Sequence, residues 1–464
     1  MHFQWAVVAF GLVAAACATP SGPTPAAAAG LVETASPNQA FVAEARAKIE
    51  KYVADNQFSG AVLVAKDGQP VLREGFALAN RELGVPVKPE TVFRLGSITK
   101  QFTAAAIMQL VEQGKIGLDD PVSKYYAAAP AAWSKITVKH LLNHRSGIPS
   151  YTGLPDFFEK HAALDRTPEQ VVEFTRDMPL EFEPGAKFEY NNTGYVLLGY
   201  IIEKVSGQTY ADYLVAHIFT PLGMKHSGYD DTTTLIPQRA AGYGFEDGVW
   251  TNAAYLSMTL PHAAGSLYST VDDLLVWEEA LFAGKVVSRA SFDAMTTDYG
   301  GEYGFGLGVD ELEGHESINH SGGIPGFSTY MTRFPDDGLT VIALSNLENG
   351  RPTRLANDLA RLWLGLPEPA ALVAVTVKPE VLERYVGVYE LMPKFNITVA
   401  RAGDGITVQA TGQSAFPLTS TSDTEFHFQQ AGVRIVFPAG DGPAQSLTLF
   451  QGGERTAKRI AAPN

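Results

Sequence analysis

The 464-residue sequence contains a single cysteine, Cys17, which excludes internal disulfides and cysteine-ligated metal sites. Basic residues are also few: the chain has 35 Lys and Arg against 50 Asp and Glu, which gives a net charge of -15. Such a chain has no basic surface with which to neutralise nucleic acid phosphates or anionic lipid. There is no repeat at solenoid or propeller periods and no G-x-S-x-G nucleophile motif. These absences disfavour a repeat protein, a nucleic-acid-binding protein and an α/β-hydrolase.

The N-terminus has the pattern of an export signal. An apolar run at residues 5–16, too short to span a bilayer, precedes a Ser/Pro/Ala-rich stretch at 19–30. Cys17 follows three alanines and resembles the lipid-acceptor cysteine of bacterial lipoprotein signals, although the first four residues carry no Lys or Arg. We expect a periplasmic or outer-membrane lipoprotein that meets the membrane only through lipid on Cys17. The alternative is ordinary cleavage and a secreted soluble product.

The remaining chain predicts two folded domains, because its length exceeds what one hydrophobic core usually organises. We expect a leader at 1–37, a hydrolase domain at 38–367 and a C-terminal domain at 368–464. A Pro- and Ala-rich passage at 366–379 marks the second boundary. The segments after it alternate in polarity and predict an antiparallel β module without catalytic residues, at 397–401, 406–410, 433–437 and 447–450.

Helical and strand patterns alternate through residues 38–367 and predict a mixed α/β body. The most apolar helix is expected at 98–113, ended by Gly114, and should therefore be buried at the centre. Further expected elements are a helix at 41–53, a β-hairpin from 60–64 and 70–73, helices at 195–205 and 272–282, and a buried strand at 340–344.

Ser97 stands just before this central helix, and Lys100 lies three positions later on the same helix face. A lysine amine whose pKa is lowered by burial can take the proton from a serine hydroxyl, and the helix N-terminus and the Ser97 amide can stabilise an oxyanion. A serine here also suits an N-cap, and a lone S-x-x-K arises readily by chance. The pair by itself leaves both interpretations open.

Two further motifs follow in order: Tyr190-Asn191-Asn192, and His320-Ser321-Gly322. Together with Ser97-Ile98-Thr99-Lys100 they resemble the three motifs of serine β-lactamases and penicillin-binding proteins. The Tyr-x-Asn motif is similar to that of class C β-lactamases and D-alanyl carboxypeptidases. The resemblance covers about residues 58–363, and supporting stretches lie at 141–148, 221–224, 264–269 and 322–327. Residues 385–389 resemble the start of a lipocalin-like β domain fused behind such hydrolases.

The resemblance implies an α/β (α+β) fold in which helices flank an antiparallel sheet, with an all-helical subdomain and a small C-terminal antiparallel β domain. It implies that Ser97 is acylated, that Lys100 accepts its proton and that Tyr190 relays protons to the leaving group. Packing is the other role open to Tyr190.

The same resemblance makes Ser97, Asn192 and the strand-edge residues His320, Ser321, Gly322 and Gly323 the oxyanion and substrate-binding groups. Gly323 would supply the second oxyanion N–H. His320 stands where β-lactamases usually have lysine, so a neutral hydrogen-bonding group replaces a permanent charge. This departure favours esterase, D-amino-acid peptidase or carboxypeptidase-like chemistry over strong β-lactam hydrolysis.

A rival zinc interpretation rests on His315, Glu316 and His320, but the second histidine comes five residues after the first and strand and loop signals surround it. We therefore expect no metal and no cofactor. The predicted function is a serine hydrolase acting on a small-molecule or peptide substrate, either an ester or a D-amino-acid-containing peptide, with at most weak β-lactam hydrolysis. The alternative is a non-hydrolytic penicillin-binding or cell-wall sensor lipoprotein.

Overall fold

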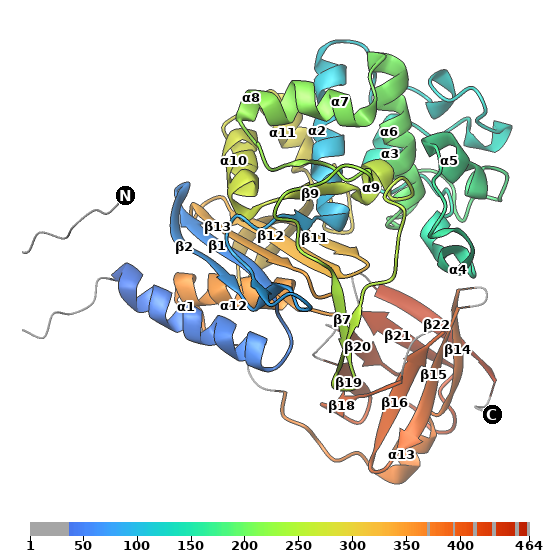
Figure 1. Ribbon diagram of the computed structural model, residues 1–464. Coiled ribbons are helices and arrows are strands. Elements are labelled where there is room, and N and C mark those ends of the chain that lie inside the picture. The colour runs from blue at the N-terminus through green and yellow to red at the C-terminus, as the bar shows by residue number, and fades with distance from the viewer. Residues whose placement is uncertain are drawn as a thin grey trace, which may run out of the picture.

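The computed structural model describes residues 37–368, 372–392, 395–411, 415–428, 433–450 and 454–461. Residues 1–36 of the leader expected at 1–37, including Cys17, lie outside the described residues. Within the described ranges, no helix combines the length and the apolar character that crossing a bilayer requires. The described chain forms an α/β body followed by a β domain (Figure 1).

A six-stranded antiparallel sheet forms the centre of the body, in the order β10-β11-β12-β13-β1-β2. The predicted hairpin is β1 and β2, and Asp67 and Gly68 turn it with φ angles of 50° and 72°. The predicted buried strand is β13, which is buried along its whole length. The strands are β1 (Gly60–Lys66), β2 (Gln69–Phe76), β10 (Gly308–Leu312), β11 (His315–Ile324), β12 (Phe327–Phe334) and β13 (Leu339–Ser345).

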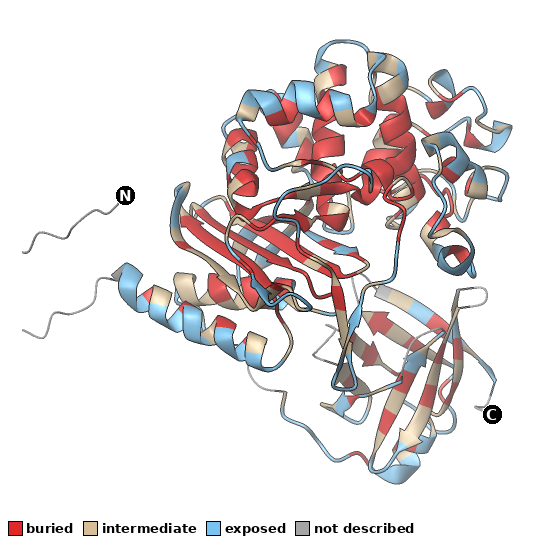
Figure 2. Cartoon of the chain, viewed as in Figure 1, coloured by how far each residue is buried: buried red, intermediate tan, exposed pale blue. Residues whose placement is uncertain are grey.

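Helices cover both faces of this sheet, which explains why its central strands are apolar on both sides (Figures 1 and 2). On one face, α1 (Pro37–Ala54) and α12 (Pro352–Leu364) pack over one cluster of apolar side chains. On the other face, a larger core joins the sheet to α2 (Thr99–Glu112), α10 (Val271–Phe282) and α11 (Arg289–Met295). The sheet therefore separates two hydrophobic cores.

The predicted central helix is α2, and only Val111, Gln109 and Glu112 among its residues escape full burial. It ends before Gly114, whose φ of 68° suits glycine. Its start differs from the prediction, because a 3-10 turn, Gly96–Ile98, precedes Thr99. Ser97 thus lies in a tight turn leading into α2.

The predicted all-helical subdomain stands beside α2. The predicted helix at 195–205 is α6, which begins earlier, at Asn192, because the side chain of Asn191 caps it. Asn192 is therefore the first residue of a helix and not part of an extended turn. The other helices are α3 (Val138–Leu142), α4 (Phe157–His161), α5 (Pro168–Arg176), α7 (Tyr210–Leu214), α8 (Thr220–Leu222) and α9 (His262–Gly265).

Short strands connect this subdomain to the sheet. β5 (Phe93–Arg94) and β6 (Gly228–Tyr229) pair with β9 (Leu267–Ser269) between them. The hairpins β3 (Leu78–Asn80) with β4 (Val85–Pro86), and β7 (Tyr243–Glu246) with β8 (Val249–Asn252), lie in the connecting loops. Strand β5 leads directly to the turn that carries Ser97.

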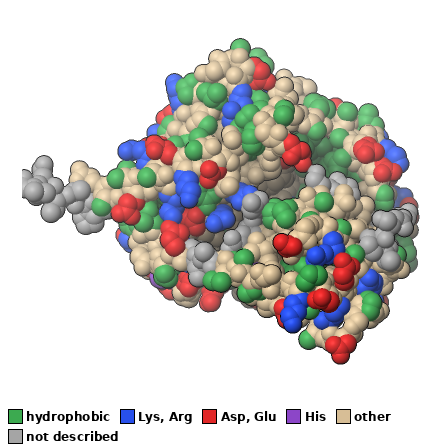
Figure 3. Space-filling view, turned by 90° about the horizontal axis from the view of Figure 1, so that it is seen from below, with side chains coloured by type: hydrophobic (Ala, Val, Ile, Leu, Met, Phe, Trp, Pro, Cys, Tyr) green, Lys and Arg blue, Asp and Glu red, His purple; other side chains and the backbone are tan. Residues whose placement is uncertain are grey.

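The C-terminal domain is a nine-stranded, nearly closed antiparallel sheet with its own apolar core, so the predicted β module is confirmed (Figure 1). A short helix, α13 (Pro379–Glu383), precedes it. The strands are β14 (Gly387–Met392), β15 (Phe395–Ala402), β16 (Gly405–Ala410), β17 (Phe416–Pro417), β18 (Thr419–Ser420), β19 (Glu425–Phe428), β20 (Val433–Val436), β21 (Ser446–Phe450) and β22 (Glu454–Ala461). Seen from below, the molecule intersperses acidic and basic side chains and is hollowed near the centre of this face (Figure 3).

Candidate active site

The turn that carries Ser97 is held against strand β11 by glycine. Gly96 has a φ of 56°, and a Cβ atom there would lie 2.8 Å from the amide nitrogen of Gly323. Any side chain at Gly96 would therefore push the turn away from the strand. Thr329 Oγ1 also donates to the Leu95 carbonyl at 2.7 Å. These contacts place Ser97 and Gly323 in the wall of the same cleft.

Lys100, one turn further on, is fully buried directly behind Ser97. Its Nζ lies 3.0 Å from Ser97 Oγ, 2.9 Å from Asn192 Oδ1 and 2.8 Å from the carbonyl oxygen of Ala264. Nζ also lies over the ring of Tyr190, 4.7 Å from its centroid. The structure thus brings together Ser97, Lys100, Tyr190 and Asn192, which lie far apart in the sequence.

Complete burial without a counter-ion favours a neutral amine at Lys100. Burial lowers the pKa of Lys100 well below its ordinary value of 10.5. A neutral amine has two N–H donors, which Asn192 Oδ1 and the Ala264 carbonyl accept. Its one lone pair is then left for the third partner, the hydroxyl of Ser97. The lone pair of a neutral Lys100 amine therefore faces the Ser97 hydroxyl.

Tyr190 also contacts Ser97 through a hydrogen bond between their side chains. Burial raises the pKa of Tyr190 above its ordinary value of 10, and the bond to Ser97 only partly opposes this. The structure therefore holds a protonated phenol beside a neutral amine, so Tyr190 can donate a proton but does not start as a phenolate.

The Tyr190-Asn191-Asn192 segment is anchored to the loop that follows α3. Asn192 Nδ2 donates to Thr152 Oγ1 at 3.1 Å, and its backbone N–H donates to Ser150 Oγ at 3.2 Å. The side chain of Asn191 donates to the Ile148 carbonyl and accepts the Gly194 N–H at 2.7 Å. Because Asn192 is held on both sides, its oxygen stays directed at Lys100.

His144 is a site residue to which sequence reasoning gave no specific role. Its carbonyl accepts the N–H of Glu189 at 2.9 Å and its Nδ1 accepts the N–H of Asn191 at 3.0 Å, so it holds the residues on either side of Tyr190. Its ring packs 4.3 Å from that of Tyr190. His144 falls within the stretch at 141–148 that supports the family resemblance. Its contacts to Tyr190, however, arise only in the folded structure.

His320 lies on β11, as its strand signals predict, and so does the rival motif at 315–320. Strand β10 pairs with β11 only as far as Asn319, so residues 320–323 run past its end, as expected of a strand edge. His320 Nδ1 lies 2.6 Å from the Ser321 carbonyl and Nε2 lies 2.9 Å from the hydroxyl of Tyr303. Burial lowers the pKa of His320 to about 3, so the ring is neutral. Tyr303 carried no sequence signal.

Ser321 and Gly323 are exposed, whereas His320 and Gly322 point inward, as alternation along a strand requires. Ser97 opens into a cleft that is continuous with solvent. None of the described residues that line this cleft is charged. They are Ser97, Tyr151, Thr152, Phe158, Asn192, Leu256, Leu260, Pro261, Ala264, Gly265, Gly323, Ile324 and Pro325.

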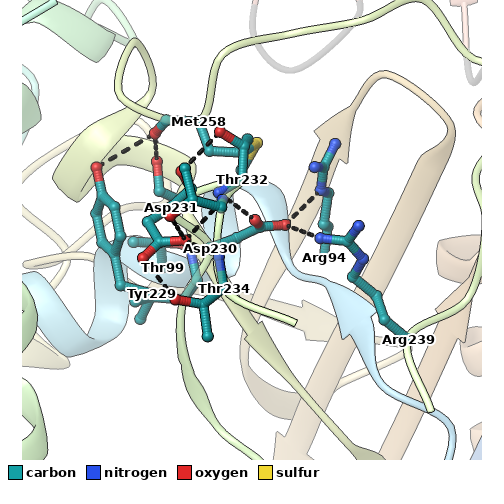
Figure 4. Close-up of polar contacts among 12 residues, drawn as sticks. Arg94, Thr99, Tyr229, Asp230, Asp231, Thr232, Thr234, Arg239 and Met258 are labelled. Atoms are coloured by element: carbon teal, nitrogen blue, oxygen red, sulfur yellow. Dashed lines mark hydrogen bonds and ion pairs between the residues drawn. The ribbon is translucent and has the colours of Figure 1, made fainter. Parts of the chain in front are cut away.

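A buried ion-pair cluster supports the strand that leads to Ser97. The carboxylate of Asp230, which is fully buried, accepts from Arg94 Nε at 2.8 Å and from Arg239 Nη1 at 3.1 Å (Figure 4). The Asp230 N–H donates to the Ser266 carbonyl at 2.9 Å. Asp230 thereby fixes β5 and the loop from 230 to 257 to one another, and none of these charges lines the cleft.

Comparison with known proteins identifies the family to which the chain belongs. The beta-lactamase family model matches residues 45–364, and a domain of unknown function, DUF3471, matches residues 372–459. The chain belongs to the beta-lactamase family and is a serine hydrolase. Its sequence resemblance to serine β-lactamases and penicillin-binding proteins is thereby confirmed, and the second match agrees with a separate C-terminal domain.

Three relatives illustrate the range of this family. Penicillin-binding protein 4* of Bacillus subtilis is 31% identical and covers 86% of this chain and 94% of its own length. A D-aminopeptidase of Gluconobacter oxydans is 28% identical, over 77% of this chain and 72% of its own. The structure of an octameric penicillin-binding protein homologue from Pyrococcus abyssi is 30% identical, with a TM-score of 0.66, and covers 90% of this chain and all of its own.

Proposed function

We propose that this protein forms an acyl-enzyme on Ser97 and releases it to water, acting on esters or on D-amino-acid-containing peptides. One observation carries the proposal: the buried Lys100 amine gives both of its N–H groups to carbonyl oxygens, which leaves its lone pair for the Ser97 hydroxyl 3.0 Å away. A serine so placed is an activated nucleophile.

In the acylation step, Ser97 Oγ attacks the substrate carbonyl carbon while its proton passes to Lys100 Nζ. The carbonyl oxygen becomes an oxyanion, for which the N–H groups of Ser97 and Gly323 are the proposed donors. As the carbon–heteroatom bond breaks, Tyr190 gives its phenolic proton to the leaving group and regains one from the Lys100 ammonium. The products are the Ser97 ester, the protonated leaving group and a neutral Lys100.

Deacylation repeats these transfers with water. Water loses a proton to Lys100, directly or through Tyr190, and its oxygen attacks the ester carbonyl. The bond to Ser97 Oγ breaks, and Oγ recovers a proton from the same relay. No described residue that lines the cleft carries a carboxylate, so the activation of water falls to the two groups that already served acylation.

The range of acyl donors is supported by the relatives and by His320. The D-aminopeptidase among them supports D-amino-acid substrates for this chain. A neutral His320, whose two ring nitrogens are occupied by Ser321 and Tyr303, supplies no permanent charge for a substrate carboxylate. We therefore expect at most weak β-lactam hydrolysis.

The test is a hydrolysis screen with p-nitrophenyl esters, D-alanyl peptides and nitrocefin on wild type and Ser97→Ala. We expect a fluorophosphonate to label Ser97 and turnover to vanish in the variant. Hydrolysis that is unchanged in Ser97→Ala, without any adduct, would remove the proposal. A stable penicilloyl adduct on Ser97 with no turnover of any ester would favour the alternative, a binding or sensor protein that acylates without hydrolysis.

We also propose that the protein is exported and carries lipid on Cys17, with a secreted soluble form as the alternative. The apolar run at 5–16 followed by Cys17 supports this. Globomycin-sensitive processing and a diacylglycerol mass on the mature N-terminus are the expected results in a bacterial host. An unmodified, soluble mature product would overturn lipidation.

A further inference from the structure

Among the residues that the structure describes, none that lines the cleft beside Ser97 carries a charge that could hold a charged substrate. Large apolar or aromatic side chains make up much of its lining: Tyr151, Phe158, Leu256, Leu260, Ile324 and Pro325. The polar side chains in the lining are those of Ser97, Thr152 and Asn192 and the hydroxyl of Tyr151, which donates to the Leu260 carbonyl. A charged substrate group that enters this cleft loses its hydration without gaining an oppositely charged partner, which costs free energy.

The two ionisable groups nearest to Ser97 do not change this conclusion. Lys100 lies behind the serine, and its three neighbours Ser97, Asn192 and Ala264 already occupy its nitrogen. His320 is turned inward, and Tyr303 and the Ser321 carbonyl hold both of its ring nitrogens. Neither group is free to bind a carboxylate, and neither can accept a bond from an ammonium without losing a partner.

Two of the segments that contribute to this lining, 157–166 with helix α4 and 253–260, are joined by hydrogen bonds. The Ser257 N–H donates to the Ala162 carbonyl at 2.7 Å, and Ser257 Oγ donates to Asp165 at 2.6 Å. The Arg166 N–H donates to Thr259 Oγ1 at 2.9 Å. These bonds direct the polar groups of the segments at 157–166 and 253–260 towards each other, which leaves the apolar side chains for the cleft.

Apolar side chains continue outward to the mouth of the cleft. Phe158 lines the cleft and is still 45% exposed, and Tyr255, next to the cleft residue Leu256, is 60% exposed. Large apolar side chains that remain exposed beside a site favour an apolar ligand.

We propose that the acyl group accepted by Ser97 is uncharged and apolar, as in esters of simple aliphatic acids, and that Phe158 contributes to this selection. This inference rests on the proposed acyl transfer at Ser97 and narrows its substrate class. Substrates with a free carboxylate or a free α-ammonium in the acyl group are poor acyl donors for this enzyme, because the cleft offers no opposite charge.

The test compares acyl groups of equal length that differ in charge. p-Nitrophenyl pentanoate and p-nitrophenyl hydrogen glutarate share a leaving group, and only the second carries a carboxylate. We expect kcat/KM to be about 10²-fold higher for the pentanoate, because the carboxylate would be buried unpaired. For amides, N-acetyl-D-phenylalanine p-nitroanilide should likewise be cleaved faster than D-phenylalanine p-nitroanilide, which has a free ammonium.

A matched pair of variants tests the role of the wall. Phe158→Arg places a cation at the cleft and should lower the preference for pentanoate over hydrogen glutarate by at least about 10-fold. Leu164→Arg is the control, since Leu164 lies in the same segment and is equally exposed at 45%, but does not line the cleft. It should leave the preference unchanged. Equal changes in both variants would overturn the role of Phe158.

Failure of this inference is distinguishable from failure of the acyl-enzyme itself. If wild type hydrolyses the hydrogen glutarate as fast as the pentanoate, and Ser97→Ala abolishes both activities, the charge preference is wrong and the acyl-enzyme stands. If wild type cleaves neither ester, the preference for uncharged acyl groups is also wrong, because the pentanoate is then not a substrate. If cleavage of both esters survives in Ser97→Ala, both proposals fall.

Discussion

Lys100 and Asp230 are both ionisable, both show 0% exposure and both lie close to β5, yet the protein treats them in opposite ways. Asp230 sits between Arg94 and Arg239 and forms ion pairs with both (Figure 4). Lys100 contacts a hydroxyl, an amide oxygen and a backbone carbonyl, none of which is a counter-ion, so burial keeps its amine neutral. A buried charge with counter-ions supports structure, whereas a buried group without one supplies a base.

The largest effect is expected from variants in which residue 100 cannot be a neutral amine. Lys100→Ala and Lys100→Arg should both lower kcat/KM by about 10²- to 10⁴-fold, because both variants lack a neutral amine. Hydrolysis of p-nitrophenyl pentanoate measures the effect, and melting temperatures identify variants that fail to fold. An active Lys100→Arg enzyme would show that the neutral amine is not the base.

The same comparison predicts the direction of the pH profile. Only the neutral amine accepts a proton, so wild-type kcat/KM rises as pH increases through the pKa of Lys100 and then levels off. Burial puts that pKa well below 10.5, so the rise occurs far on the acid side of ordinary lysine titration. A rate that falls over that range would contradict the assignment.

Glu278 is a third buried group, and it sharpens the comparison because neither of its carboxylate oxygens has a hydrogen-bond partner. Burial raises its pKa from 4.5 to about 8. Because the folded pKa is the higher one, its stability contribution is complete below pH 4.5 and is lost as the pH rises through 8. The loss accumulates at about 1.4 kcal/mol per pH unit.

Glu278→Gln, which cannot ionise, should therefore gain stability over wild type between pH 5 and pH 8, by about 4 kcal/mol at pH 8. Urea unfolding at the two pH values measures this gain. Glu279→Gln is the control, because Glu279 is partly exposed and paired with Arg333, and its stability difference from wild type should not grow over this range. A Glu278→Gln difference that is constant with pH would contradict the raised pKa.

Removing the charge of Asp230 should lower the stability of the fold and leave the catalytic rate largely unchanged. Asp230→Asn leaves Arg94 and Arg239 without a counter-ion and should lower the free energy of unfolding by about 3 kcal/mol. Its neighbour Asp231, whose contacts are to the exposed Thr233 and Thr234, offers a matched control in Asp231→Asn, with an effect of about 1 kcal/mol or less. Equal losses in the two variants would mean that the ion pairs of Asp230 contribute no more to the free energy of unfolding than the hydrogen bonds of Asp231.

The smallest effect concerns His144, which positions Tyr190 without touching Ser97. Asparagine can accept the Asn191 N–H in place of Nδ1 and tolerates the φ of 58° at this position. His144→Asn should therefore keep most of the activity, whereas His144→Leu should lower kcat by about 10-fold with little change in KM. Equal kcat values in the two variants would remove the positioning role.

Local patterns predicted much of the fold. The β1–β2 hairpin, the burial of β13 and α2, the helix α10 and the strands after 395 all follow from signals within a few residues. Helix starts were less accurate, because a 3-10 turn at Gly96 and a cap at Asn191 depend on neighbouring segments. The zinc-like motif at 315–320 was correctly predicted to be non-helical, since β11 contains it.

By itself, the sequence determined the class of the protein and the identity of its central residues. Ser97, Lys100, Tyr190, Asn192 and His320 occur in motifs of defined spacing, and spacing is a property of the chain. Only the tertiary structure decided the state of these groups. Burial sets the protonation of Lys100, the contact with Tyr303 turns His320 away from substrate, and loops far apart in sequence make the cleft uncharged, because desolvation and pairing exist only once the chain has folded.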